Sequence, residues 1–77
     1  MEAAGSTVLW RLFRKSAVRT DRTHAVILPG GPPHTLAFFA NGYMDRAENY
    51  DAMELALFRA DEIKRSLLAE HWLDEGA

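Results

Sequence analysis

Residues 7–14 are mostly apolar, and their pattern fits the two-residue period of a strand. One face of a strand built from this segment carries Val8, Trp10 and Leu12. The β-branched and aromatic residues of the segment also favour a strand. A helix that begins after Ser6 fits the spacing of the apolar residues as well, and it is the alternative.

Two further strands are predicted on either side of a loop that is rich in proline and glycine. The apolar residues of 24–28 form the first of them, and those of 35–40 form the second. Residues 29–33 contain three prolines and two glycines, which continue neither a strand ladder nor a helix. This pattern is typical of a connection between neighbouring strands.

Asn41 and Gly42 predict a two-residue β-turn directly after the third strand. A type I′ turn needs positive φ at both central residues, and Asn followed by Gly reaches these angles at little steric cost. The turn leads into a fourth strand over residues 43–48. The cross-strand pairs expected around it are Ala40 with Tyr43, Phe39 with Met44, and Phe38 with Asp45.

The last predicted element is a helix over about residues 52–70, a stretch that lacks glycine and proline. Asp51, followed three residues later by Glu54, predicts a side-chain cap at its N-terminus. The apolar positions of this helix gather on one face. They are Met53, Ala56, Leu57, Ala60, Ile63 and Leu67.

These elements predict one small α+β domain that spans residues 1–77. We expect an antiparallel β-meander of three to four strands packed on one long C-terminal helix. Residues 1–6 are small and polar, and we expect them to be disordered. A chain of this length buries only about 60% of its unfolded surface, so its hydrophobic core is thin.

Composition indicates a globular protein without a signal for export or membrane insertion. Hydrophobic residues make up 48% of the chain and charged residues 26%. The longest apolar run, residues 36–40, is far below the roughly 20 residues of a membrane span. The N-terminus carries an early acid, Glu2, and lacks the basic and apolar regions of a secretory signal. We therefore expect a cytoplasmic protein, and the excess of arginine over lysine is typical of GC-rich bacterial genomes.

The sequence contains no catalytic motif, and we expect a non-enzymatic protein without cofactor or metal. The absence of cysteine excludes thiol catalysis, iron–sulfur clusters and cysteine-bound zinc. Gly30 and Gly31 are not followed by the lysine and the serine or threonine of a phosphate-binding loop. His24 and His34 would face each other across a hairpin, with Asp21 nearby, but no metal-ligand spacing accompanies them.

Charge is distributed unevenly along the chain, and the N-terminal segment is basic. Residues 1–24 carry a net charge of +3, residues 25–44 contain no Asp, Glu, Lys or Arg, and residues 45–77 carry −5. A basic segment beside Trp10 and Phe13 favours contact with a phosphate backbone and with unpaired bases. Weak nucleic-acid binding is therefore the alternative function, placed second because the whole chain is acidic. The residues assigned to it are Arg11, Arg14, Lys15, Arg19 and Arg22.

Apolar residues on the expected surface favour a protein partner. Leu55 and Phe58 lie on the side of the helix turned away from the sheet. Phe38 and Phe39 are adjacent and point to opposite faces of the sheet, so a single helix leaves one of them on the surface. We therefore expect an association module that binds itself, as a homodimer, or another protein. The predicted interface residues are Leu55, Phe58, Phe38, Phe39 and Met44.

Overall fold

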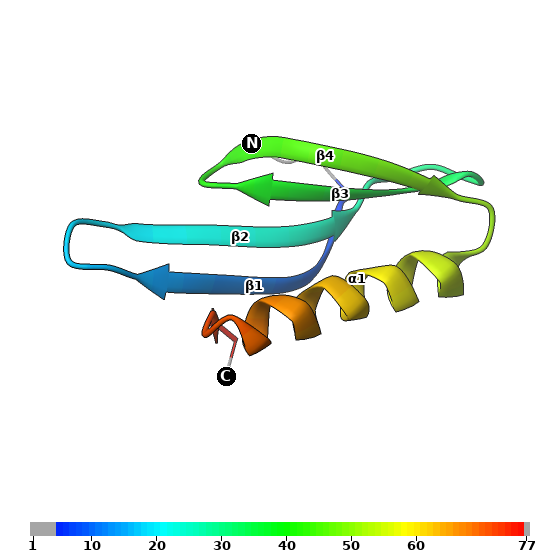
Figure 1. Cartoon of the computed structure of the whole chain (residues 1–77). Coiled ribbons are helices and arrows are strands. Elements are labelled where there is room, and N and C mark those ends of the chain that lie inside the picture. The colour runs from blue at the N-terminus through cyan, green and yellow to red at the C-terminus, as the bar shows by residue number, and fades with distance from the viewer. Residues whose placement is uncertain (1–4, 77) are drawn as a thin grey trace.

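Five antiparallel strands and one helix make up residues 5–76, the part of the chain that the computed structural model describes (Figure 1). The elements are β1 (Thr7–Lys15), β2 (Thr20–Ile27), β3 (His34–Ala40), β4 (Tyr43–Tyr50), α1 (Met53–Ala69) and β5 (Leu73–Asp74). The strand order is β4-β3-β2-β1-β5. The predicted α+β meander with one long helix is confirmed, and a short fifth strand is added beside β1.

The hairpin of β1 and β2 is longer than its apolar pattern indicates. Residues 7–14 form a strand and not a helix, and β1 continues to Lys15. β2 begins at Thr20, earlier than predicted, because the two strands stay in register down to the pair of Lys15 and Thr20. The turn is closed by the Ser16 N–H, which donates to the Arg19 carbonyl at 2.8 Å. In Figure 1 this hairpin extends beyond β3 and β4.

The turn between β3 and β4 is confirmed, since Asn41 and Gly42 both have positive φ, at 52° and 88°. The two predicted pairs nearest the turn are also confirmed. The third is wrong, because Phe38 pairs with Arg46 and not with Asp45. A β-bulge at this point places Asp45 as an additional residue in β4. The bulge brings the Arg46 guanidinium over the Phe38 ring, 5.0 Å from its centroid.

Helix α1 lies against one face of the sheet, and its boundaries fall one residue inside the predicted ones. Its N-cap is Ala52, which makes no side-chain hydrogen bond, so the predicted Asp51 cap is wrong. Asp51 lies one position before the cap, where its carboxylate is displaced from the free amides of the first turn. The Ala52 carbonyl accepts from the Leu55 and Ala56 N–H groups at 3.2 and 3.4 Å.

The C-terminal end of α1 is closed by a residue in the left-handed region. His71 has φ 72°, an angle that is usually taken by glycine at this position. The N–H groups of Glu70 and Trp72 both donate to the Leu67 carbonyl, at 2.9 and 3.1 Å. This turn reverses the chain, so that β5 pairs with Leu12 and Phe13 of β1.

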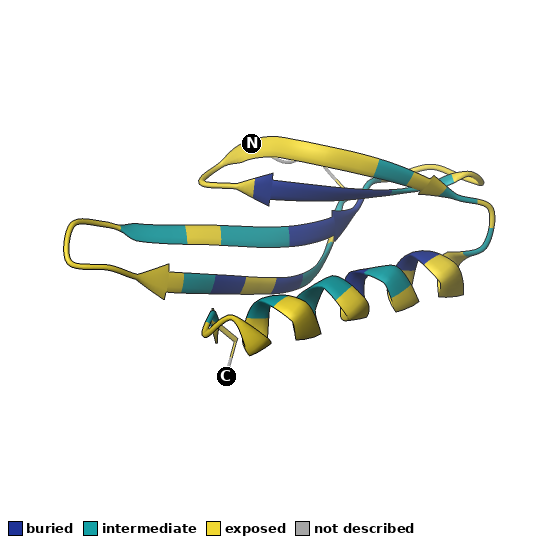
Figure 2. Ribbon diagram, viewed as in Figure 1, coloured by how far each residue is buried: buried dark blue, intermediate teal, exposed yellow. Residues whose placement is uncertain are grey.

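The main core lies between the sheet and α1, and Figure 2 shows buried residues on the strands and on the inward side of the helix. Its buried members are Trp10, Leu12, Ala25, Ile27, Leu36, Phe38, Ala56 and Ala60. The Trp10 Nε1–H donates to the Ala60 carbonyl at 2.9 Å, which ties β1 to the helix. Of the predicted helix face, Ile63 and Leu67 pack against this core, whereas Met53 and Leu57 are exposed.

A second buried cluster contains Val26, Ala37 and Phe39. Since adjacent strand residues point to opposite faces, this cluster lies on the face away from α1. Phe38 and Phe39 are therefore both buried, at 4% and 7% exposure, and the prediction that one of them lies on the surface is wrong. Phe38 packs against Trp10, and Phe39 stacks on His24 with ring centroids 4.8 Å apart.

The predicted disorder of residues 1–6 falls partly outside the described residues, which begin at Gly5. Gly5 and Ser6 lead directly into β1. Within residues 5–76, no helix has the length and apolar character to cross a membrane.

Candidate interaction surfaces

The first two turns of α1 expose four large apolar side chains, Met53, Leu55, Leu57 and Phe58, which we call the α1 patch. Their exposed fractions range from 38% at Met53 to 69% at Phe58. Leu55 and Phe58 are three residues apart, and Met53 and Leu57 are four apart, so each pair is adjacent on the helix surface. The patch therefore consists of two adjacent apolar pairs, and Glu54 lies between them on the helix surface.

The patch arises from the way in which small and large residues are placed around the helix. Ala56 and Ala60 are the buried residues of α1, and they let the helix backbone approach the sheet closely. The larger residues next to them in sequence are turned outward. The later turns are polar, since Asp61 pairs with Arg65 at 2.8 Å. The exposed apolar residues of α1 are thus concentrated in its N-terminal half, and Leu68, which is 40% exposed, is a further one near the C-terminal end.

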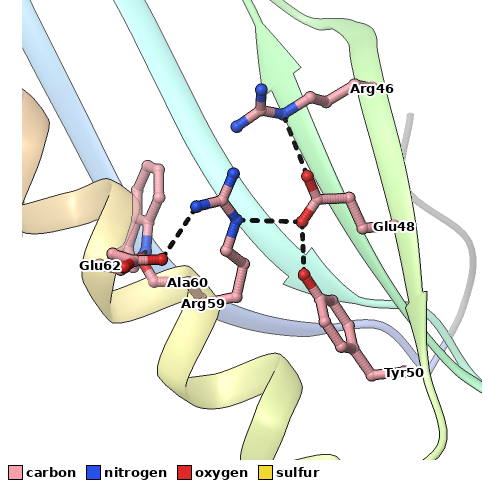
Figure 3. A network of polar contacts seen from close by, with 7 residues as sticks. Arg46, Glu48, Tyr50, Arg59, Ala60 and Glu62 are labelled. Atoms are coloured by element: carbon pink, nitrogen blue, oxygen red, sulfur yellow. Dashed lines mark hydrogen bonds and ion pairs between the residues drawn. The ribbon is translucent and has the colours of Figure 1, made fainter.

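A polar network anchors this half of α1 to β4 (Figure 3). The Tyr50 hydroxyl donates to Glu48 Oε1 at 2.7 Å, and the Arg59 Nε–H donates to the same oxygen at 3.2 Å. The hydrogen bond from Tyr50, with the help of Arg59, lowers the pKa of Glu48 below its ordinary value. The same bond raises the pKa of the Tyr50 hydroxyl. The bond between Arg59 and Glu48 ties α1 to β4 beside the patch, and Arg59 also binds Glu62 of the same helix at 2.9 Å.

Met44 does not belong to the same surface as Leu55 and Phe58. It is 52% exposed and pairs with Phe39, whose cluster lies on the face away from α1. Since Phe38 and Phe39 are buried, the five predicted interface residues do not form one continuous surface. Leu55 and Phe58 are the two that the structure brings together on α1.

The five basic residues of the nucleic-acid hypothesis are divided between the two sides of the sheet. Arg14 lies on the α1 side, where its guanidinium is 4.6 Å from the centroid of the Trp72 ring. Arg19 lies in the hairpin turn and pairs with Asp21 at 3.0 Å. Trp10, expected to lie beside them as a stacking residue, is buried in the core.

The other three basic residues share the face away from α1. Arg11 and Lys15 lie two residues before and after Phe13 on β1, and Arg22 is the cross-strand partner of Phe13 on β2. Trp10 and Leu12 point into the core, so alternation places these side chains on the opposite face.

An open hollow of about 600 Å³ lies beside Phe13 on this face, lined by Phe13, Lys15, Arg22, Leu73, Asp74 and Glu75. Leu73 pairs with Phe13 across the β1–β5 ladder, so the hairpin supplies one wall and the C-terminal strand supplies the other. The sequence analysis missed Leu73 and Glu75, because the pairing of β5 with β1 joins segments some sixty residues apart and leaves no local signal.

The predicted proximity of His24 and His34 is wrong. The β2–β3 register places His24 opposite Phe39, whereas His34 is opposite Tyr50 on β4. No group of three or more His, Asp or Glu residues in metal-binding arrangement occurs between residues 5 and 76.

Comparisons with protein-family models, with curated proteins and with solved structures found no match.

Proposed function

We propose that this protein is an association module that forms a homodimer through the α1 patch. The observation that carries the proposal is the reversed placement of residue sizes on α1. Ala56 and Ala60 face the core, while Leu55 and Phe58 face solvent. A helix whose only role is to cover a sheet usually has the opposite arrangement, with its large apolar residues buried.

The small size of the chain supports the same proposal. A domain of 77 residues has a thin core, and self-association is a common way for such a domain to bury more apolar surface. Large apolar side chains exposed together on one helix are typical of an interaction site. The α1 patch lies on a helix that the network of Glu48 and Arg59 holds in place, so little ordering is needed on association.

A second copy of the chain is the partner that fits the patch most simply. In a two-fold dimer the same surface covers itself, so an apolar patch needs no separate partner of matching shape. Glu54 is the one charged residue within 53–58, and the ion pairs of the helix begin after this segment. The interface would thus be mainly apolar, with Glu54 as its one charge and the ion pairs of the helix outside it, which is close to the usual composition of a stable interface.

The mass of the protein in solution, measured by light scattering over a range of concentrations, tests this proposal. We expect twice the monomer mass of 8.7 kDa, and we expect the dimer to persist when the salt concentration is raised, because an apolar interface is not screened by salt. A monomer at every concentration would show that the α1 patch does not bind a second copy, and would leave a different protein as its partner.

A further inference from the structure

The face away from α1 carries an aromatic ring framed by cations. Phe13 is half-buried on β1, with Arg11 and Lys15 on either side of it along the strand. Arg22 lies opposite Phe13 on β2, and Leu73 lies opposite it on β5. The ring therefore forms the floor of a surface that has three positive charges around it and an apolar side chain next to it.

Two of these cations are available to a ligand. Arg11 and Lys15 are exposed, and neither forms an ion pair with another residue in the described range. Arg22 is held by Glu75, with 3.7 Å between Nε and Oε1; the Arg22 side chain is 62% accessible to solvent, and that of Glu75 is 32% accessible. The carboxylate of Glu75 lines a hollow with each of these two residues without forming an ion pair with either.

The spacing of these groups fits a nucleotide chain. Arg11 and Lys15 are four residues apart on one strand, a distance of about 13 Å along β1. A base stacked on Phe13 would place its neighbouring phosphates toward these two cations. The hollow beside Phe13, about 600 Å³, falls within the range of sites that hold small organic groups such as a base or a sugar.

We propose that Phe13, framed by Arg11, Lys15 and Arg22, is a stacking platform for single-stranded nucleic acid. Stacking on an aromatic side chain combined with backbone contacts from basic residues is how proteins bind single strands without reading sequence. A duplex keeps its base faces stacked inside the helix, so a ring on an open sheet face reaches only an unpaired base. The site involves no residue of α1 and goes beyond the proposed dimer.

Glu75 limits the affinity of this site. Its carboxylate lines the hollow and binds Arg22, so it competes with a phosphate for that cation. The substitution Glu75→Gln removes the competing charge and keeps the shape of the side chain. We expect it to strengthen binding of a single strand, an effect opposite to that of most substitutions in a binding site.

Fluorescence anisotropy tests the proposal with three probes: a labelled thymidine oligomer of about 12 nucleotides, a duplex of equal length, and inorganic polyphosphate as a competitor. We expect the single strand to bind at low salt. A plot of the logarithm of its affinity against the logarithm of the salt concentration should have a slope of about −1.4 for phosphate contacts with Arg11 and Lys15, and about −2 if Arg22 also binds a phosphate. The duplex should bind more weakly. Absence of single-strand binding at low salt, or equal affinity for the duplex, would overturn the proposal.

Matched variants separate stacking from general attraction between charges. Phe13→Leu keeps an apolar side chain but removes the aromatic face, and it should weaken single-strand binding roughly ten-fold. The affinity for polyphosphate, measured by competition, should be unchanged. Arg11→Gln and Lys15→Gln should each weaken binding and reduce the salt slope. Arg14→Gln makes the same change of charge on the same strand, on the α1 side, and should have no effect. Equal effects of Arg14→Gln and Arg11→Gln, or no effect of Phe13→Leu in a folded variant, would contradict the proposed site.

Discussion

The substitution Phe58→Glu is the most direct perturbation of the proposed dimer. Phe58 is 69% exposed in the single chain, so most of its side chain is available for burial by a partner. A phenylalanine side chain offers about 150–250 Å², of which roughly 100–170 Å² is therefore still accessible here. At about 25 cal/mol per Å², complete burial of this area stabilises a dimer by about 2.5–4 kcal/mol per copy.

Both copies contribute to a two-fold interface, so even half-complete burial gives about 3 kcal/mol in total. Because each 1.4 kcal/mol changes an equilibrium constant ten-fold, loss of this contribution raises the dissociation constant at least about a hundred-fold. The glutamate adds two carboxylates to an apolar interface, where an unpaired charge is unfavourable. We therefore expect Phe58→Glu to be monomeric at concentrations where the wild-type protein is a dimer.

Sedimentation velocity over a concentration series measures this difference, with Ser66→Glu as the control. Ser66 is exposed on the same helix, outside the α1 patch, and its substitution introduces the same charge. We expect the control to remain a dimer. Since Phe58 is largely exposed, its substitution should change the unfolding free energy of the monomer by less than about 0.5 kcal/mol. A Phe58→Glu variant that keeps the wild-type mass at every concentration would refute the interface.

Three further predictions concern the fold. Trp10→Phe removes the buried hydrogen bond to the Ala60 carbonyl and part of the ring, and should lower the unfolding free energy by about 2 kcal/mol in urea titrations followed by circular dichroism. The hydrogen bond from Tyr50 is the main cause of the lowered pKa of Glu48 in the folded state. The ionised carboxylate therefore stabilises the folded protein at pH values above its ordinary pKa of 4.5, and this stabilisation is lost as the pH falls through the lowered pKa of the folded state. Glu48→Gln should therefore show a smaller loss of thermal stability between neutral and acidic pH than the wild-type protein does; an equal loss would exclude this contribution. His71→Gly relieves a left-handed residue at the end of α1 and should raise the unfolding free energy by about 0.5–1 kcal/mol, whereas a decrease would show that the imidazole makes a stabilising contact.

Features set by neighbouring residues were predictable from the sequence. The Asn41-Gly42 turn needs only two residues with accessible positive φ, and it places Ala40 opposite Tyr43 in any hairpin that it closes. The helix follows from a long stretch of helix-forming residues without glycine or proline. The outward direction of Leu55 and Phe58 follows from the helical repeat once the buried face is known.

Features that depend on pairing between distant segments were not predictable. The bulge at Asp45 shifts the β3–β4 register beyond the turn, and nothing in the local sequence requires it. β5 is two residues long, too short to give a periodic pattern, and it forms because the turn at His71 directs the chain back along β1. The basic residues were identified as a group, but only the register of β1 with β2 shows that Arg14 lies on the opposite side from Arg11.

The two proposed surfaces lie on opposite sides of the fold, and this arrangement constrains how they act together. The α1 patch faces away from the sheet, and Phe13 lies on the sheet face away from α1. A dimer joined at the α1 patch would thus carry its two Phe13 platforms on its outer sides, separated by two helices and two sheets. A short oligonucleotide cannot reach both, so it should bind once per chain with equal affinity for monomer and dimer. Only a strand long enough to pass around the dimer gains from the second platform, because the second contact is then intramolecular. An affinity that rises steeply with strand length in the wild-type protein, but not in Phe58→Glu, would therefore report both surfaces in one measurement.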